Sequence, residues 1–370
     1  MAREFLSQPM GPSWKGTHDL IQQSLGEVSS SVSVAVYRKS EPELFRYAYE
    51  GQVSGGGAST SLETQYDLAS LTKVLVTAPL VALFVERGWI RWNTPLREFF
   101  PVSPLLTVEN LMAHHSGLPN WLPFFEEMRK SFPHLERHSL EEKQRHMRSL
   151  VFEVEPGTPK TLYSDLGMLL LGFMIEEVTG QRLDKAAQKY LWSPLGIKEL
   201  GYRYIGKVRG PTWNIAATED CPWRGKVLQG EVHDDNCYSM GGVAGHAGVF
   251  GTLKGVMQFV AGLQGGGILS SPSLKEYLYR RPFGDRGLGW DVRSPDGSLV
   301  GTCLGSKVVG HWGFTGTGLW MDPETGVALL QLTNRVHPLR GSTESINHLR
   351  PRLNDQLWKD LQHQPQGGAS

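Results

Sequence analysis

The order of strand-like and helix-like segments is the feature that most restricts how this chain can fold. Near the N-terminus, Ser31–Arg38 alternates valine with other residues, and Leu44–Glu50 suits a hairpin partner. Strand character returns only late, in three β-rich segments interrupted by glycine: Gly287–Val292, Val308–Met321 and Gly326–Thr333. Consecutive late strands favour antiparallel pairing. We therefore expect one antiparallel sheet built from both ends of the chain.

The middle of the chain is predicted to be helical. One helix should contain Ser70, run towards Arg87 and end at Gly88, with Asp67 as its N-cap. Its apolar residues lie nearly all round, so it should be buried, and Pro79 should kink it. Further helices are predicted over Leu166–Val178, Leu183–Leu191 and Leu353–Leu361, with a solvated helix or lid over Lys130–Leu150.

The predicted fold class is α+β, an antiparallel sheet flanked by helices with an inserted all-helical domain. With 370 residues the chain suits one large or two interleaved domains. We expect residues 1–66 and 267–370 to form a discontinuous sheet domain, residues 67–266 to form a mainly helical insert, and the active site to lie between them. The tail from Gln362 is predicted to be disordered.

Composition excludes several classes of partner. Lys+Arg and Asp+Glu both number 37, without long runs of one sign, so neither nucleic acid nor an anionic membrane surface is expected. Cys221, Cys237 and Cys303 are odd in number and match no metal-ligand spacing, which argues against a disulfide framework. The first residues lack the apolar stretch of a signal peptide, and no run approaches the roughly 20 apolar residues of a membrane span. We therefore expect a cytoplasmic protein.

Ser70-Leu71-Thr72-Lys73 is a Ser-x-x-Lys motif at the start of the buried helix. Residues three apart share a helical face, so the Lys73 amine can reach the Ser70 hydroxyl. Burial should lower the pKa of Lys73, and a neutral amine could then act as a base. The alternative is a helix-start serine beside a lysine that snorkels to solvent.

Two further motifs could complete a site. Tyr163, two residues before Asp165, could relay a proton if a nearby cation lowers its pKa; the alternative is a buried tyrosine with Asp165 as a helix cap. Glycines in the strand segment Gly310–Gly316 suggest close approach of a ligand or another backbone. The Phe314 and Ser70 amides could together bind an oxyanion. The alternative is a glycine-rich bend with a structural histidine at position 311.

A histidine- and aspartate-bearing loop covers Gly230–Asn236 and Gly241–Gly248. These side chains could bind a metal. We prefer a polar loop that packs near the site, and we expect neither a metal nor another cofactor. Asn334–Pro338 closes the last strand and could line the substrate groove.

Taken in order, Ser-x-x-Lys, Tyr-x-Asx and a cationic residue-x-Gly on a late strand resemble the signature of penicillin-recognising serine hydrolases. The chain looks like the class C β-lactamase branch, which includes esterases and penicillin-binding-protein relatives. Leu111–Leu118 and Leu191–Gly196 support the likeness, which extends from Val32 to Asn334.

This resemblance implies the β-lactamase/transpeptidase fold, with Ser70 as the acylated nucleophile, Lys73 as its proton partner and Tyr163 as a proton shuttle. His311-Trp312-Gly313 stands where β-lactamases have Lys-Thr-Gly, and Asp165 stands where the best-studied members have asparagine. A histidine is only partly charged at neutral pH, and an anionic Asp165 disfavours an anionic substrate group. Both departures suit a neutral ester or amide at a substrate-binding surface made by these residues.

We therefore expect a serine hydrolase that forms a covalent acyl-enzyme with a small ester, β-lactam or amide. Esterase, β-lactamase and D-Ala peptidase activities all remain open, as does the oligomeric state. The alternatives are a penicillin-binding receptor or a D-amino-acid carboxypeptidase-like protein with little turnover, and a scaffold without activity.

Overall fold

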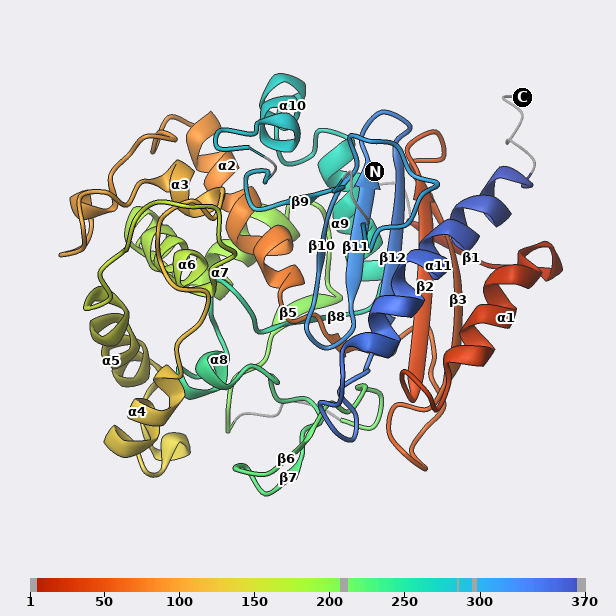
Figure 1. The fold of residues 1–370 in the computed structure, drawn as a ribbon, viewed down its shortest axis with the longest axis horizontal. Helices are drawn as coiled ribbons and strands as arrows, with labels where there is room; N and C mark the ends of the chain where they lie inside the picture. The colour runs from red at the N-terminus through yellow and green to blue at the C-terminus, as the bar shows by residue number, and fades with distance from the viewer. Residues whose placement is uncertain (1–4, 207–211, 285, 295–297, 365–370) are drawn as a thin grey trace.

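The computed structural model describes residues 5–206, 212–284, 286–294 and 298–364, and a seven-stranded sheet forms its centre (Figure 1). The strand order is β1-β3-β2-β12-β11-β10-β9, and every pair is antiparallel except β1 with β3. The strands are β1 (Leu6–Pro9), β2 (Ser31–Arg38), β3 (Leu44–Gly51), β9 (Asp291–Val292), β10 (Val309–Trp312), β11 (Gly318–Asp322) and β12 (Val327–Thr333). Pairing of β2 with β12 joins the two ends of the chain. The predicted α+β class with a mainly antiparallel sheet is confirmed.

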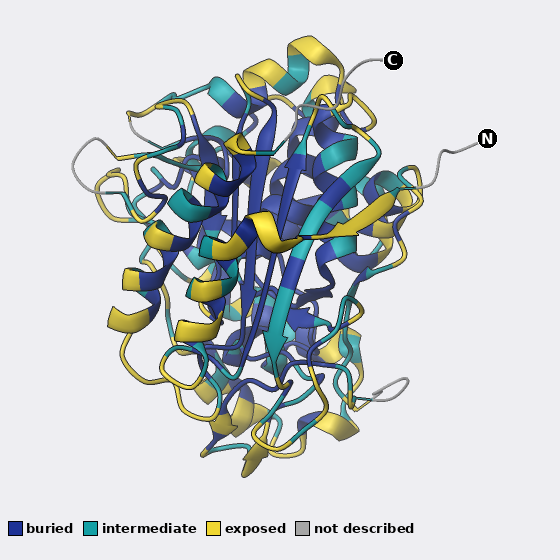
Figure 2. Ribbon diagram, turned by 90° about the vertical axis from the view of Figure 1, so that its right-hand side faces the viewer, coloured by how far each residue is buried: buried dark blue, intermediate teal, exposed yellow. Residues whose placement is uncertain are grey.

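Helices bury both faces of this sheet, and alternate residues of β2 enter two different cores. The covering helices are α1 (Lys15–Ser24), α9 (Leu253–Gln264) and α11 (Glu344–Gln362). Val32, Val34 and Val36 share a core with α1 and α11, whereas Ala35 and Tyr37 point to the opposite face and share a core with α9. Figure 2 shows the resulting buried strands between helices whose outward faces are exposed.

The remaining helices gather beside the sheet, on the left of Figure 1. They are α2 (Ala78–Glu86), α3 (Val108–Met112), α4 (Phe124–Ser131), α5 (Leu140–Phe152), α6 (Asp165–Thr179), α7 (Leu183–Ala187), α8 (Asp235–Ser239) and, at the top, α10 (Ser271–Tyr279). Two small sheets accompany them, one of β4 (Tyr66–Asp67), β8 (Val249–Gly251) and β5 (Leu200–Tyr202), the other of β6 (Asp220–Cys221) and β7 (Lys226–Val227). The domain boundaries after residues 66 and 266 stay a prediction, although α9 lies within the expected insert and packs on the central sheet.

Several elements differ from the sequence-based expectation. Strand β1 and helix α1 were not predicted, because their short segments are mostly polar and contain few apolar residues. Helix α11 begins at Glu344 rather than Leu353 and continues through Pro351, because its apolar face packs on the sheet and offsets the missing backbone hydrogen bond. The expected strand Val308–Met321 is two strands joined by a turn. Helix α11 reaches Gln362, and residues 365–370 of the predicted disordered tail lie outside the described residues.

The start of the Ser70 helix is wider than a regular α-helix. A π-helical turn, Lys73–Thr77, precedes α2. Pro79 follows this turn directly in one continuous helical segment, and the widened turn accommodates the backbone hydrogen bond that the proline cannot donate. The predicted irregularity is therefore located one turn before the proline. None of the helices in the described ranges is both long enough and apolar enough to cross a bilayer.

A glycine contact fixes the loop of residues 241–248 against α6, and its loss should destabilise the protein. A Cβ on Gly245 would lie 2.1 Å from the Met168 carbonyl oxygen and 3.2 Å from Gly172 Cα. We expect Gly245→Ala to lower the free energy of unfolding by about 3 kcal/mol, measured by urea denaturation. Gly201→Ala is the matched control, because a Cβ there meets no atom within 4 Å. Equal stability of the two variants would contradict the close packing.

Candidate active site

A strained turn presents Ser70, the predicted nucleophile. Strand β4 ends at Asp67, whose carboxylate accepts hydrogen bonds from the Ala69 amide at 2.9 Å and the His233 amide at 2.6 Å. The predicted capping residue thus holds the turn before the helix. Ala69 has φ of +47°, a conformation that costs a residue with a Cβ on the order of 1–3 kcal/mol. The surrounding hydrogen bonds keep this strain in place and hold Ser70 at the helix entrance.

The three predicted catalytic side chains meet at one oxygen atom. Lys73 Nζ donates to Ser70 Oγ at 2.8 Å, and the Tyr163 hydroxyl donates to the same oxygen at 3.0 Å. Lys73 comes from the π-helical turn, while Tyr163 comes from the residues just before α6. Lys73 is fully buried. The structure therefore brings together residues that lie on two separate helical segments.

Lys73 is held as a cation, which corrects the expectation of a lowered pKa. Its Nζ forms an ion pair with Asp165 Oδ1 at 2.8 Å and donates to the His246 carbonyl oxygen at 3.0 Å. Burial disfavours the ammonium, but the Asp165 carboxylate and Tyr163 outweigh burial, so the pKa of Lys73 is raised above its ordinary value. The expectation failed because it considered burial without the neighbouring carboxylate.

Tyr163 is a neutral phenol at neutral pH. Burial raises the pKa of Tyr163 to about 12, against the opposing influence of the Lys73 ammonium. The His114 ring lies 4.9 Å from the Tyr163 ring, centroid to centroid, and burial holds the pKa of His114 well below its usual value. The nearby cation therefore does not lower the pKa of Tyr163 below its ordinary value, as the sequence analysis had allowed. The phenol acts here as a hydrogen-bond donor to Ser70 Oγ.

A glycine turn places the predicted oxyanion donors. The Gly313 amide donates to the Thr317 carbonyl oxygen at 2.8 Å, and the Phe314 side chain projects outward with 48% exposure. A Cβ on Gly313 would lie 2.9 Å from the Leu68 carbonyl oxygen, so only glycine lets this turn approach the Ser70 segment. Within the described residues, neither the Phe314 nor the Ser70 amide donates to a protein acceptor. Both N–H groups are therefore available to an incoming oxygen.

His311 does not replace the lysine charge of the related motif. Its Nδ1 lies 2.8 Å from the Trp312 carbonyl oxygen, and its ring lies 5.7 Å from the Tyr163 ring, centroid to centroid. Burial lowers the pKa of His311 to about 4, although Asp291 opposes this shift. The imidazole is consequently neutral at neutral pH, rather than partly charged as expected.

Ser70, Tyr163 and His311 line a cavity of about 620 Å³. It is bordered by Ala69, Ser70, Asn120, Trp121, Tyr163, Asp165, His233, Asp234, Asp235, Ala247, Arg286, Asp291, His311, Trp312, Gly313, Phe314, Arg335, Arg340, Thr343 and Arg350. The sequence analysis missed the arginines as a group. The segment Asn334–Pro338 was expected to line the groove, and the structure places Arg335 on the cavity wall.

The cavity arginines fall into two kinds. Arg286 pairs with Asp291, and Arg340 bonds to both Glu219 and Asp235. Arg335 and Arg350 pair with no carboxylate in the described part of the chain, and both donate to backbone carbonyls. The lining therefore contains two arginines without a carboxylate of their own among the described residues.

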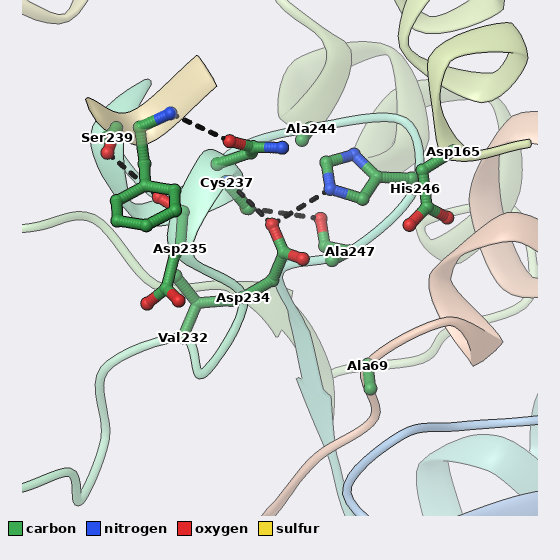
Figure 3. A network of polar contacts seen from close by, with 12 residues as sticks. Ala69, Asp165, Val232, Asp234, Asp235, Cys237, Ser239, Ala244, His246 and Ala247 are labelled. Carbon is green, nitrogen blue, oxygen red and sulfur yellow. Dashed lines mark hydrogen bonds and ion pairs between the residues drawn. The ribbon is translucent and has the colours of Figure 1, made fainter. Parts of the chain in front are cut away.

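The 230–248 loop lines the cavity as a network of pairs. Asp234 caps α8 by accepting from the Cys237 amide at 2.7 Å, and its Oδ1 lies 2.9 Å from His246 Nε2 (Figure 3). His233 Nε2 lies 2.9 Å from a Glu219 carboxylate oxygen. Among the described residues, no three histidine, cysteine or acidic side chains gather in an arrangement that could hold a metal. The loop supports Lys73 through the His246 carbonyl.

The antiparallel sheet, the Ser-x-x-Lys turn and the facing tyrosine define a protein of the β-lactamase/transpeptidase fold with a site of serine-hydrolase type. The family model described as "Beta-lactamase" matches residues 18–349, and the chain belongs to this family. A Salmonella agona protein named "Putative D-alanyl-D-alanine carboxypeptidase" is 30% identical over 311 residues, covering 74% of this chain and 70% of that protein.

Solved structures share the fold at lower identity. Simvastatin synthase from Aspergillus terreus superposes with a TM-score of 0.71 at 15% identity, covering 96% of this chain and all of that one (100%). D-amino acid amidase from Ochrobactrum anthropi superposes with a TM-score of 0.68 at 19% identity, and the match covers 95% of this chain and 100% of the amidase chain. These likenesses establish the architecture, and the substrate must be argued from the site.

Proposed function

We propose that this protein hydrolyses a small amide or ester through a covalent acyl-enzyme at Ser70. The observation that carries the proposal is the meeting of Lys73 Nζ and the Tyr163 hydroxyl at Ser70 Oγ, on the wall of the cavity. Ser70 Oγ attacks the substrate carbonyl carbon, the Ser70 and Phe314 amides stabilise the oxyanion, and the leaving group departs with a proton. Water then releases the acid and restores the serine.

Asp165 offers a route for discharging Lys73. Moving one proton from the ammonium to the Asp165 carboxylate leaves a neutral amine and a neutral acid without changing the net charge of the pair. The amine can then take the Ser70 proton as the Ser70–carbonyl bond forms. Tyr163, whose hydroxyl is protonated and bonded to Ser70 Oγ, can deliver its proton to the departing group and regain one from the Lys73 ammonium, so the proton taken from Ser70 ends on the leaving group.

The pH dependence of an Asp165 variant tests this electrostatic arrangement. Burial lowers the pKa of Lys73 and the Asp165 carboxylate raises it. Asp165→Asn removes that carboxylate, so the pKa of Lys73 should fall. Because the active amine is unprotonated, the ascending limb of kcat/KM against pH should move to lower pH in the variant. Rates for nitrophenyl butyrate measured from pH 5 to 10 would show the shift. A limb that stays in place or moves to higher pH would contradict the assignment.

A D-amino-acid carboxypeptidase is the second candidate. Arg335 is buried beside the cavity without a carboxylate partner among the described residues, which favours a substrate that brings its own carboxylate. The names of the Salmonella relatives point to the same substrate class. The neutral His311 and the anionic Asp165 argue for a neutral substrate, whereas the positive charge of Arg335 argues for an anionic one. Arg335→Gln should then raise KM for a D-Ala-D-Ala peptide but not for a neutral ester.

One substrate panel and one labelling experiment separate the functions. The purified protein would be assayed with nitrophenyl acetate and butyrate, nitrocefin, a D-amino-acid amide and a D-Ala-D-Ala peptide. A fluorophosphonate adduct located on the Ser70 peptide by mass spectrometry supports the acyl-enzyme proposal, and no adduct would reject it. A long-lived penicillin adduct without turnover of any substrate would instead favour the receptor.

A further inference from the structure

Arg350 of α11 is a buried cation directly behind the oxyanion turn. Its guanidinium is 4.4 Å from the centroid of the Trp312 ring, and the residue is only 7% exposed. Nη1 donates to Asn347 Oδ1 at 3.1 Å, and Nη2 donates to the Gly313 carbonyl oxygen at 3.0 Å. No carboxylate in the described ranges pairs with it, and its Nε has no partner there. Burying an unpaired charge is costly, so a functional reason is needed.

The acceptor of this hydrogen bond belongs to the peptide that carries the proposed oxyanion donor. The Gly313 carbonyl and the Phe314 N–H are the two ends of one trans peptide unit. In a trans peptide these groups point in opposite directions, so anchoring the oxygen on α11 aims the N–H away from that helix. A cation bonded to the carbonyl also polarises the peptide and strengthens the N–H as a donor. A polarised, fixed donor is the arrangement that stabilises developing negative charge.

A second arginine, Arg335, also bonds to the Gly313–Phe314 turn. Its Nε donates to the Phe314 carbonyl oxygen at 2.8 Å, and its guanidinium lies 4.6 Å from the Phe314 ring centroid. That carbonyl belongs to the following peptide, which does not contain the Phe314 N–H. Of the two arginines, only Arg350 therefore acts on the donor peptide itself.

We infer that Arg350 is a positioning residue that orients and polarises the Gly313–Phe314 peptide, so that the Phe314 N–H stabilises the oxyanion during acyl transfer. The inference rests on the proposed acyl-enzyme function and deepens it. It links helix α11, far from Ser70 in sequence, to the chemical step. Because the effect belongs to the transition state, it should appear in kcat more than in KM.

The test compares Arg350→Met and Arg350→Lys with the parent on a neutral ester, nitrophenyl butyrate, so that recognition of substrate charge does not contribute. Arg350→Met should lower kcat roughly 10- to 100-fold with KM within about twofold, because the donor remains but loses its orientation. Binding of phenylboronic acid, which forms a tetrahedral adduct with a reactive serine, should weaken by a similar factor. Arg350→Lys should restore most of the loss, since it keeps the cation.

Arg203→Met is the matched control. Arg203 is half-buried, its guanidinium lies 5.4 Å from the Phe250 ring centroid, and it donates to Gln65 Oε1, but it does not border the cavity. The inference predicts unchanged kcat for this variant, even if its melting temperature falls as far as that of Arg350→Met. Equal losses of kcat in both variants would overturn it, as would unchanged boronate affinity in Arg350→Met.

Two further measurements keep the inference falsifiable. Should Arg350→Met fail to fold, Asn347→Ala removes the acceptor of Nη1 and should lower kcat partially, whereas full activity would overturn the inference. Fluorophosphonate labelling of Ser70 tests the acyl-enzyme function and the role of Arg350 separately. A parent protein without labelling refutes the acyl-enzyme function itself. A labelled parent with equally fast labelling of Arg350→Met refutes only the role of Arg350.

Discussion

Ser70→Ala is expected to reduce kcat for nitrophenyl esters and nitrocefin by on the order of 10⁴- to 10⁶-fold, the range seen when a serine hydrolase loses its nucleophile. The Ser70 hydroxyl is the atom to which Lys73 and Tyr163 both donate. Removing it leaves no oxygen at their meeting point to form the acyl bond. The measurement is steady-state hydrolysis, together with intact-mass analysis for an acyl adduct.

Ser24→Ala is a suitable control for this prediction. Ser24 is a buried serine on α1 whose hydroxyl donates to the Ile21 carbonyl oxygen at 2.7 Å, and it does not border the cavity. Its variant should keep full activity. Turnover by Ser70→Ala at the parent rate would remove the basis for the acyl-enzyme proposal, because no other step in it supplies a nucleophile.

Lys73→Met is expected to lower kcat by about 10³-fold or more, because it removes the group that takes the Ser70 proton. It also leaves Asp165, whose side chain is 16% exposed, without its cation. We expect this to lower the free energy of unfolding by up to about 3 kcal/mol. Kinetics should therefore be measured well below the melting temperature of the variant, with circular dichroism confirming that it is folded.

A second variant separates the charge of Lys73 from its basicity. Lys73→Arg keeps a cation beside Asp165 but cannot release a proton near neutral pH, so it should be almost as inactive as Lys73→Met. Lys143→Met provides the control, since Lys143 is another buried lysine, bonded to the Leu135 carbonyl oxygen and remote from the cavity lining. Substantial activity in Lys73→Arg would show that Lys73 acts through its charge alone.

The sequence predicted those parts of the site that depend on local spacing. Residues three apart at a helix start share a face, so the contact of Ser70 with Lys73 followed from the motif itself. The alternating valines of β2 predicted a strand, and the glycines near Phe314 indicated a close approach. In each case the signal lies within a few residues and needs no knowledge of the tertiary fold.

The features that were missed depend on distant parts of the chain meeting. The pKa of Lys73 follows from the 2.8 Å separation of its amine from Asp165, which no spacing in the sequence reveals. Arg350 lies outside the predicted helix Leu353–Leu361, and its proposed role depends on how α11 packs against the turn at Gly313. Helix α11 itself was shortened in the prediction because a proline usually ends a helix, and tertiary packing overrides that preference here.

Lys73 differs in exposure from two aromatic side chains that border the cavity, and this difference has an evolutionary consequence. Lys73 is fully buried, whereas Trp121 and Phe314 border the same cavity with 42% and 48% exposure. Substitutions of the two exposed aromatic side chains can alter which molecules enter without repacking the interior. Selection can thus diversify ligand preference at these two positions while the buried contacts of Ser70, Lys73 and Tyr163 are inherited intact, which makes Trp121 and the Phe314 side chain natural positions for directed evolution.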